Sequence, residues 1–153
     1  MLHIVLFRPE IPPNTGNIAR LCAGTGTSLH LIEPLGFSLD SRYLKRAGLD
    51  YWPHVDMKSW PSLTAYLAAD GAGRRLVSAS ARHGEAIQHF AFLPDDSLLL
   101  GPESVGLPPD IQSMAERHIR IPIKDCIRSL NLSSSAGIIL YFALAYLGEL
   151  ESW

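Results

Sequence analysis

Short apolar runs that alternate with helical segments are the feature that most constrains how this chain can fold. Residues 2–7, 29–32, 76–79 and 97–100 are almost continuously apolar. Strands that lack an alternation of apolar and polar residues are buried on both faces, which is typical of a parallel sheet covered by helices. We therefore predict an α/β fold with one parallel sheet, helices on both of its faces, and a single domain over residues 1–153.

The predicted helices lie between and after these strands. They span residues 17–23, 41–47, 59–69, 109–115 and 133–147, and residues 118–121 form a further strand. Pro9, Pro12 and Pro13 predict an extended loop before the first helix, with Asn14 or Thr15 as the N-cap of that helix.

The composition is that of a soluble globular protein, with 47% hydrophobic and 18% charged residues. The chain has no signal-peptide pattern, and its longest apolar stretch, residues 138–147, is about half of the roughly 20 residues that a membrane span needs. Cys22 and Cys126 are too few for a disulfide framework. We therefore expect a cytoplasmic protein without membrane contact. Because the net charge is −2, any nucleic-acid binding depends on a local basic patch.

Several common ligand-binding patterns are missing from the sequence. No G-x-G-x-x-G follows the first strand, and there is no P-loop motif, no G-x-S-x-G and no Cys or His spacing typical of zinc. These gaps argue against a dinucleotide-binding protein, a P-loop nucleotidase, an α/β-hydrolase and a zinc enzyme. We expect no bound metal.

Three polar segments lie where a parallel sheet binds its ligands, beyond the carboxyl ends of strands. In the first, PPNTGNIAR at residues 12–20, the free N–H groups and positive dipole end of a helix suit a phosphate or a sugar, with Arg20 about one turn further on. The same pattern would fit an N-capped helix in which Arg20 forms a surface ion pair.

The second segment is GPESVGLPP at residues 101–109, and the third runs from residue 121 to 137 and contains SLNLSSSAG. Glycines in the second let a ligand approach the backbone, although the loop could also be a rigid connection in which Glu103 caps a backbone amide. Small residues in the third allow close backbone approach, although they could simply cap an apolar helix.

Together the three segments resemble the signature motifs of the SPOUT class of RNA ribose 2′-O-methyltransferases, in its TrmH-like group. The motifs are N-x-G-N-x-x-R at residues 14–20, G-x-E-x-x-G-L-P at 101–108 and S-L-N-L-S at 129–133, in family order. The resemblance implies a C-terminal trefoil knot, and S-adenosylmethionine held in the knot crevice mainly by backbone groups, without a metal. The implied cofactor contacts are Ala79, Gly101, Gly106, Ile121, Ser129 and Leu130.

Within this class, the short chain and the segments at residues 9–17 and 46–51 resemble the branch that methylates the wobble ribose of leucine tRNAs. The implied reaction is methyl transfer to the 2′-hydroxyl of cytidine 34 or a modified uridine 34. Two alternatives stay open. One is a 2′-O-methyltransferase for another tRNA position or for ribosomal RNA, and the other is a non-catalytic module that binds RNA or a nucleotide.

We take Arg20, Asn17 and Asn131 as the candidates for catalysis, with Glu103 and Tyr141 as weaker ones. The resemblance assigns Arg20 to the ribose hydroxyl as a base. A guanidinium, however, has a pKa above about 12 and no acceptor atom. Arg20 could therefore hold an RNA phosphate and stabilise the developing alkoxide instead, and we predict that it is essential in either role.

The last predicted helix is apolar all round, so both of its sides must be buried. A homodimer that packs this helix against its twin is the simplest solution, and the resemblance implies the same arrangement. Two subunits could then join their basic groups on tRNA, although any one of these groups could equally be a solvated surface residue. The candidate tRNA contacts are Arg8, Arg42, Lys45, Arg46 and Arg128, with Arg74 and Arg75 as further ones.

Overall fold

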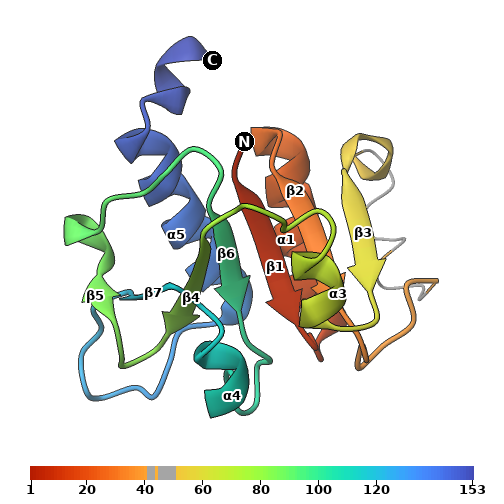
Figure 1. Ribbon diagram of the computed structural model, residues 1–153, viewed down its shortest axis with the longest axis horizontal. Coiled ribbons are helices and arrows are strands. Elements are labelled where there is room, and N and C mark those ends of the chain that lie inside the picture. The colour runs from red at the N-terminus through yellow and green to blue at the C-terminus, as the bar shows by residue number, and fades with distance from the viewer. Residues whose placement is uncertain (41–43, 45–50) are drawn as a thin grey trace.

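One parallel sheet of seven strands organises the computed structural model, which describes residues 1–40, 44 and 51–153 (Figure 1). The strand order is β3-β2-β1-β6-β4-β7-β5, and every neighbouring pair is parallel. The first half of the chain builds the side from β1 to β3, so the two halves meet where β1 pairs with β6. The strands are β1 (His3–Phe7), β2 (Ser28–Ile32), β3 (Met57–Trp60), β4 (Leu76–Ser80), β5 (Glu85–Ala86), β6 (Ser97–Leu100) and β7 (Arg117–Arg120).

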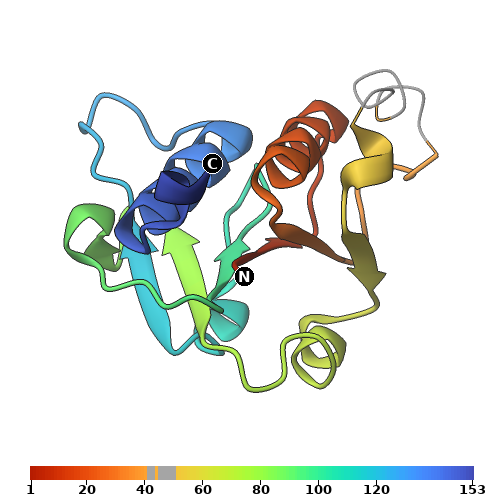
Figure 2. The same cartoon turned by 90° about the horizontal axis from the view of Figure 1, so that it is seen from above.

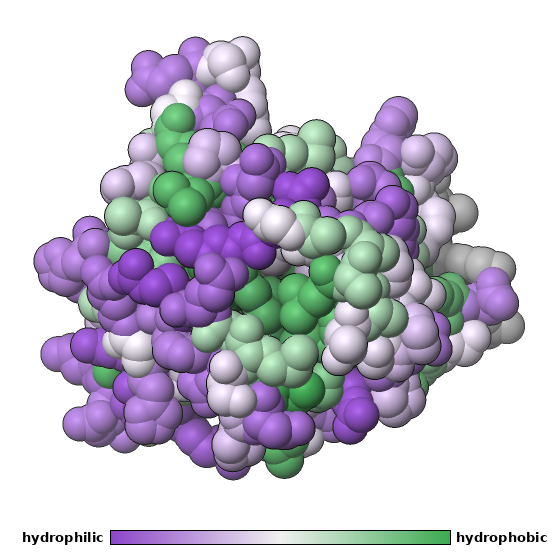
Figure 3. Space-filling view, in the orientation of Figure 1, coloured by the Kyte–Doolittle hydropathy of each residue, from purple (hydrophilic) through white to green (hydrophobic). Residues whose placement is uncertain are grey.

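Helices cover both faces of the sheet, which confirms the predicted α/β architecture (Figure 2). The two long helices lie on one face and the two short ones on the other. Apolar residues gather at the centre of the face that carries the short helices (Figure 3). The helices are α1 (Pro12–Thr25), α3 (Leu63–Leu67), α4 (Pro109–Gln112) and α5 (Leu132–Tyr146), with 3-10 turns η1 (Trp52–His54), η2 (Ile87–His89) and η3 (Glu149–Ser152).

The core lies on both sides of the central strand β1. Ile4 and Leu6 belong to the apolar cluster that includes residues of α1 and α5, whereas Val5 and Phe7 belong to the cluster under α3. All four side chains are buried. The continuous apolar run of this strand thus reflects burial on both faces, as predicted.

Helix α1 begins at Pro12, five residues earlier than predicted. Pro12 and Pro13 occupy its first turn, where a missing backbone N–H costs no helical hydrogen bond. The predicted extended loop is therefore wrong at these two prolines. The predicted N-cap is also wrong, because Ile11 takes that position while Asn14 and Thr15 lie buried within the helix.

The sequence does not predict the edge strand β3, whose half-exposed residues lack a continuous apolar run. A single helix is predicted over residues 59–69, but the first two residues belong to β3 and α3 begins only at Leu63. Pro61 explains the break, since a proline disfavours a helical conformation for the residue before it. The Ser62 hydroxyl then caps α3 by accepting a hydrogen bond from the N–H of Ala65 at 3.1 Å.

The other differences are small. Helix α4 ends at Gln112 rather than at residue 115, β7 is shifted by one residue toward the N-terminus, and the two-residue strand β5 is not predicted. Helix α5 begins one residue earlier than predicted and is capped by Asn131. The helix predicted over residues 41–47 lies outside the described residues except for Leu44, which is helical and buried.

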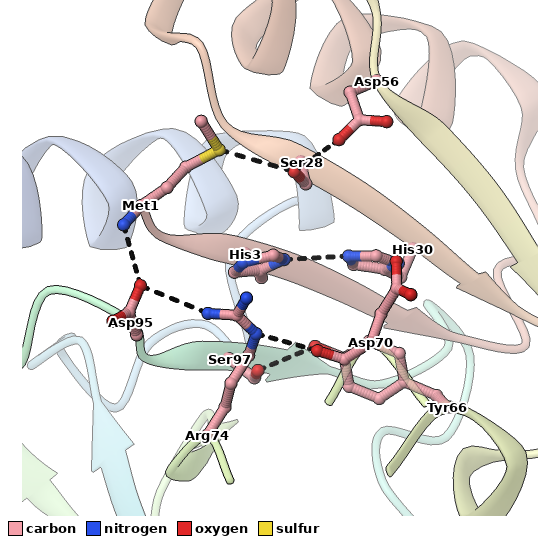
Figure 4. Close-up of polar contacts among 10 residues, drawn as sticks. All are labelled: Met1, His3, Ser28, His30, Asp56, Tyr66, Asp70, Arg74, Asp95 and Ser97. Carbon is pink, nitrogen blue, oxygen red and sulfur yellow. Dashed lines mark hydrogen bonds and ion pairs between the residues drawn. The ribbon is translucent and has the colours of Figure 1, made fainter. Parts of the chain in front are cut away.

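Two buried histidines form a hydrogen-bonded pair between β1 and β2 (Figure 4). His3 Nδ1 lies 2.9 Å from His30 Nε2, and the Nε1–H of Trp60 donates to His30 Nδ1 at 3.1 Å. Because an indole nitrogen only donates, His30 Nδ1 must accept, and His30 donates from Nε2 to His3. Burial favours the neutral rings and lowers the pKa of each histidine to about 4.

We expect this pair to make the fold less stable in mild acid. The histidine pKa is about 6.5 in the unfolded chain and about 4 in the folded protein, so the unfolded state binds more protons between these values. The stability from the neutral rings is present at pH 7 and is lost as the pH falls from about 6.5 to about 4, by about 2–3 kcal/mol for one ring. Urea unfolding at about pH 7 and about pH 4.5 measures this loss.

The variant His3→Phe should flatten this pH dependence, because it removes one of the two titrating rings. His54→Gln is the matched control, since His54 is exposed and should leave the dependence unchanged. A wild-type free energy of unfolding that is equal at the two pH values would contradict the prediction.

Candidate cofactor and catalytic site

An open cavity lies at the carboxyl ends of β4, β6 and β7. Its volume is about 840 Å³, which is within the range of small-molecule sites. The loops that follow these strands line it, together with Ile11, Asn14 and the first turns of α5. The structure brings together all six residues that the sequence predicts as cofactor contacts, and they lie on the cavity wall: Ala79, Gly101, Gly106, Ile121, Ser129 and Leu130.

Main chain forms the wall of the cavity in the loop after β6. A Cβ atom on Gly101 would lie 2.4 Å from Leu107 N and 2.6 Å from Gly106 C, much closer than real Cβ atoms come to backbone. Gly106 itself has a φ of 70°, which favours glycine. The loop therefore folds back on itself so tightly that only glycine fits at position 101.

A chain of side-chain amides joins the three polar segments at this cavity. Asn14 Nδ2 donates to Glu103 Oε1 at 3.3 Å, and Asn131 Nδ2 donates to Asn14 Oδ1 at 3.0 Å. Asn131 Oδ1 accepts from the N–H groups of Ser133 and Ser134 and so caps α5. The sequence does not predict this role of Asn14, because contacts across 89 and 117 residues of chain leave no local pattern.

Arg20 lies on the exposed side of α1 and does not line the cavity. Its guanidinium carbon is 5.5 Å from the ring centroid of Tyr51, whose hydroxyl donates to Gly16 O at 2.8 Å. Partial burial raises the pKa of Tyr51, so the hydroxyl stays a donor at neutral pH. Within residues 1–40, 44 and 51–153, no ion pair involves Arg20, and both Arg20 and Asn17 are exposed.

Of the basic residues predicted to contact RNA, those that the structure describes lie at different places in the fold. Arg128 lines the cavity, and the exposed Arg8 stacks over the Phe7 ring at 5.0 Å with a φ of 48°. Arg75 instead donates twice to the buried carboxylate of Asp96, at 2.8 and 2.7 Å, which favours a structural role. Arg42, Lys45 and Arg46 lie outside the described residues.

Arg82 is a further residue at the cavity, and it is not among the residues predicted from the sequence. It follows β4, and it bridges to the segment after β7 by pairing with Asp125 at 3.0 Å and donating to Ile127 O at 2.6 Å. The exposed Cys126 lies between these two partners, whereas the thiol of Cys22 is buried in α1. The position of Arg82 just after a predicted strand was the available signal, since ligands bind at that end of a parallel sheet.

The fold and the cavity define the class of this chain, which belongs to the SpoU rRNA methylase family; the family model matches residues 1–141. The resemblance seen in the three motifs is thereby confirmed. Where the structure describes the chain, no helix is long and apolar enough to cross a membrane, and no three His, Cys, Asp or Glu side chains gather as metal ligands.

Individual proteins of known sequence or structure are also similar to this chain. The chain is 48% identical over 148 residues to a tRNA (cytidine(34)-2′-O)-methyltransferase of Methylovorus glucosotrophus, with 94% of each chain covered. A solved structure described as giving insights into the 2-OH methylation of C/U34 on tRNA has 47% identity and a TM-score of 0.92, over 97% of both chains. The SpoU methyltransferase AviRb of Streptomyces viridochromogenes, in complex with AdoMet, has 25% identity and a TM-score of 0.83, over 98% of this chain and 58% of that one.

Proposed function

We propose that residues 1–153 form one methyltransferase domain that methylates the ribose 2′-hydroxyl of the tRNA wobble nucleotide, cytidine 34 or a modified uridine 34. The observation that carries the proposal is the meeting of three distant polar segments around one backbone-walled cavity. The names of the relatives, at 47–48% identity over nearly the whole chain, support the choice of substrate. Leucine tRNAs are the proposed substrates, and the cytoplasm is the proposed compartment.

The cavity fits S-adenosylmethionine, which supplies an electrophilic methyl group when bound. The volume of the cavity suits a ligand of this class, and Gly101 lets the loop after β6 fold back tightly to form part of the cavity wall. Apolar residues such as Ile121 and Leu130 suit an adenine ring, and the nearby amide groups suit the polar ends of the ligand. We propose that the six predicted residues on the wall hold it, and that the chain from β7 through α5 forms the trefoil knot.

The protein's own groups must then orient the ribose and stabilise the charge that develops on its 2′-oxygen. We assign this stabilisation to Arg20, because a guanidinium offers five donors and no acceptor and is always charged. Asn17 lies one turn earlier on α1 and can orient the same ribose or its phosphate. Asn131 acts from the cavity side, where it holds Asn14 and the start of α5 in place. The proton of the hydroxyl leaves to water or to an RNA phosphate.

Methyl transfer to tRNA from a strain that lacks the protein tests this proposal. Labelled S-adenosylmethionine should mark tRNA, and mapping should place the label on the ribose of nucleotide 34. A label at another tRNA position or on ribosomal RNA would show that the proposed substrate is wrong and that the labelled RNA is the substrate. Cofactor binding without transfer to any RNA would favour a non-catalytic binding module instead.

A homodimer through α5 is part of the proposal. Ile138, Tyr141, Phe142 and Tyr146 are between 36% and 58% exposed, and their spacing places them on one face of α5. A contiguous apolar helix face of this kind is typical of an interface. The exposed basic residues Arg8 and Arg128, together with Arg42, Lys45 and Arg46, are the proposed tRNA contacts.

The variant Phe142→Asp should therefore be a monomer. A charge in the middle of an apolar contact would lose its hydration on association, which costs several kcal/mol. Sedimentation equilibrium should give twice 16.8 kDa for the wild type and 16.8 kDa for the variant. Met114→Asp is the control, because Met114 is a similarly exposed apolar residue that follows α4 on the other face and should leave the dimer intact. A monomeric wild type would contradict the dimer.

Removing the Arg82 bridge should speed the release of S-adenosylmethionine. Arg82→Ala frees the segment around Asp125 and Ile127 from the loop after β4, so the cavity loses a fixed wall. We expect the dissociation constant to rise by about 3–10-fold, mostly through a faster off-rate. Stopped-flow and calorimetry measure this, with Arg117→Ala as the control, since Arg117 forms its surface ion pair with Glu85 away from the cavity. Equal rises in both variants would contradict a specific role for Arg82.

A further inference from the structure

Two carboxylates, one in the loop after β1 and one in the loop after β6, link these loops by reciprocal hydrogen bonds. Glu103 accepts hydrogen bonds from the backbone N–H groups of Glu10, at 2.8 Å, and of Ile11, at 3.1 Å. In return, Glu10 Oε1 accepts from the backbone N–H of Ser104 at 3.0 Å and from its hydroxyl at 2.7 Å. Each side chain thus binds the main chain of the other loop, 93 residues away in sequence.

Backbone and hydroxyl donors hold these charges in place. The hydrogen bonds from Ser104, first from its backbone and then from its hydroxyl, lower the pKa of Glu10, so this side chain stays ionised at neutral pH. Neither Glu10 nor Glu103 pairs with a lysine or arginine in the part of the chain that the structure describes. Glu103 also faces the N-terminus of α1, whose positive dipole end favours an anion.

The loop after β2 contacts residues 9–11 from their other side. The N–H of Gly36 donates to Pro9 O at 2.9 Å. A Cβ atom on Gly36 would lie 2.8 Å from the Cα of Glu10, so the two backbones touch. Residues 9–11 are therefore fixed by both neighbouring loops, immediately before α1 begins.

This arrangement joins the cavity wall to the helix that carries Arg20. Glu103 and Ser104 line the cavity, and so do Ile11 and Asn14 at the start of α1. Arg20 lies nine residues beyond Ile11, or about 13 Å along the helix axis. A small tilt at the start of α1 therefore moves Arg20 by a larger distance, and a misplacement of about 1 Å can cost about 100-fold in rate.

We propose that Glu10 is a positioning residue for the methyl transfer, and that it acts with Glu103 as a two-carboxylate clamp. The clamp sets the angle of α1 relative to the cofactor cavity, and so the place of Arg20 relative to the methyl group. Glu10 touches neither ribose nor cofactor in this role. The inference rests on the proposed function, because the angle matters only if Arg20 serves the reaction.

The test compares Glu10→Ala with Glu10→Gln. Glu10→Ala removes the acceptor for Ser104, and we expect kcat with saturating tRNA and cofactor to fall by about 10–100-fold. The dissociation constant of S-adenosylmethionine should change by less than about 3-fold, because the clamp leaves the cavity residues themselves in place. Glu10→Gln keeps an acceptor oxygen and should recover most of the rate. Glu85→Ala is the matched control, since it also removes one surface carboxylate contact and should leave kcat unchanged.

Hydrogen exchange gives a second readout that needs no methyl transfer. S-adenosylmethionine should slow exchange of the backbone amides of residues 10, 11 and 14 in the wild type, and this protection should be lost in Glu10→Ala. If the wild type methylated no RNA, the proposed function and the positioning role of Glu10 would both be wrong, and loss of the protection in Glu10→Ala would then show only that the two carboxylates link the cavity to α1. An unchanged kcat in Glu10→Ala, or an unchanged exchange rate at Ile11 and Ser104, would overturn the clamp.

Discussion

Replacing Arg20 with alanine should lower the rate of methyl transfer by about 100-fold or more, because we propose that Arg20 donates to the developing oxyanion, and one pre-positioned donor is worth that much in comparable sites. The dissociation constant of S-adenosylmethionine should stay within about 3-fold of the wild-type value, since Arg20 lies outside the cavity. Arg20→Lys keeps the charge but loses the planar fork of donors, so it should recover only part of the rate. Single-turnover transfer to tRNA, alongside calorimetry, separates the two quantities.

Lys58→Ala is the control for loss of a positive charge. Lys58 pairs with Asp70 at 2.6 Å on the edge strand β3, remote from the cavity lining. The Lys58→Ala variant should transfer methyl groups at the wild-type rate. If Arg20→Ala also did so, the assignment of Arg20 to the reaction would be wrong, and stacking on Tyr51 would be its whole role.

Gly101→Ala should weaken S-adenosylmethionine binding by about 100-fold or more. The added Cβ would overlap Leu107 N and Gly106 C, so the loop after β6 must move and the backbone wall of the cavity changes shape. Displacing these backbone groups would remove together several of the hydrogen bonds that we propose they make to the ligand, each worth about 1 kcal/mol or more. Calorimetry at one temperature measures the binding, and circular dichroism shows whether the fold persists.

Gly24→Ala is the matched control for this substitution. Gly24 lies in α1, and a Cβ there meets no atom within 4 Å. The change should leave cofactor binding intact and raise stability by up to about 1 kcal/mol, because alanine favours a helix over glycine. Wild-type binding by Gly101→Ala would show that the loop is not the wall we describe.

Sequence patterns were sufficient to predict a structural feature where a single segment of the chain determines that feature. The apolar run of β1 predicts burial on both faces, and the structure confirms it. Patterns failed where the outcome depends on a neighbour. Strand β3 exists because β2 pairs with it, although its own residues are half-exposed and precede a proline.

In the candidate site, too, features of single segments could be predicted, whereas contacts between distant segments could not. Its three segments could be predicted one by one, but the contact of Asn14 with Glu103 and Asn131 depends on how the folded loops meet. The pairing of His3 with His30 likewise depends on the register of β1 against β2. A trefoil knot has no local pattern at all, so only the resemblance to a family could suggest it.

The two thiols of the chain differ sharply in chemical reactivity. Burial raises the pKa of Cys22 to about 12, which keeps it in the unreactive protonated form, whereas Cys126 is exposed. A maleimide dye therefore attaches at a single native position, between the two residues that Arg82 binds. Because Arg82 lines the cavity, the fluorescence of this dye would report changes that a ligand causes in the segment bound to Arg82, with no engineered cysteine.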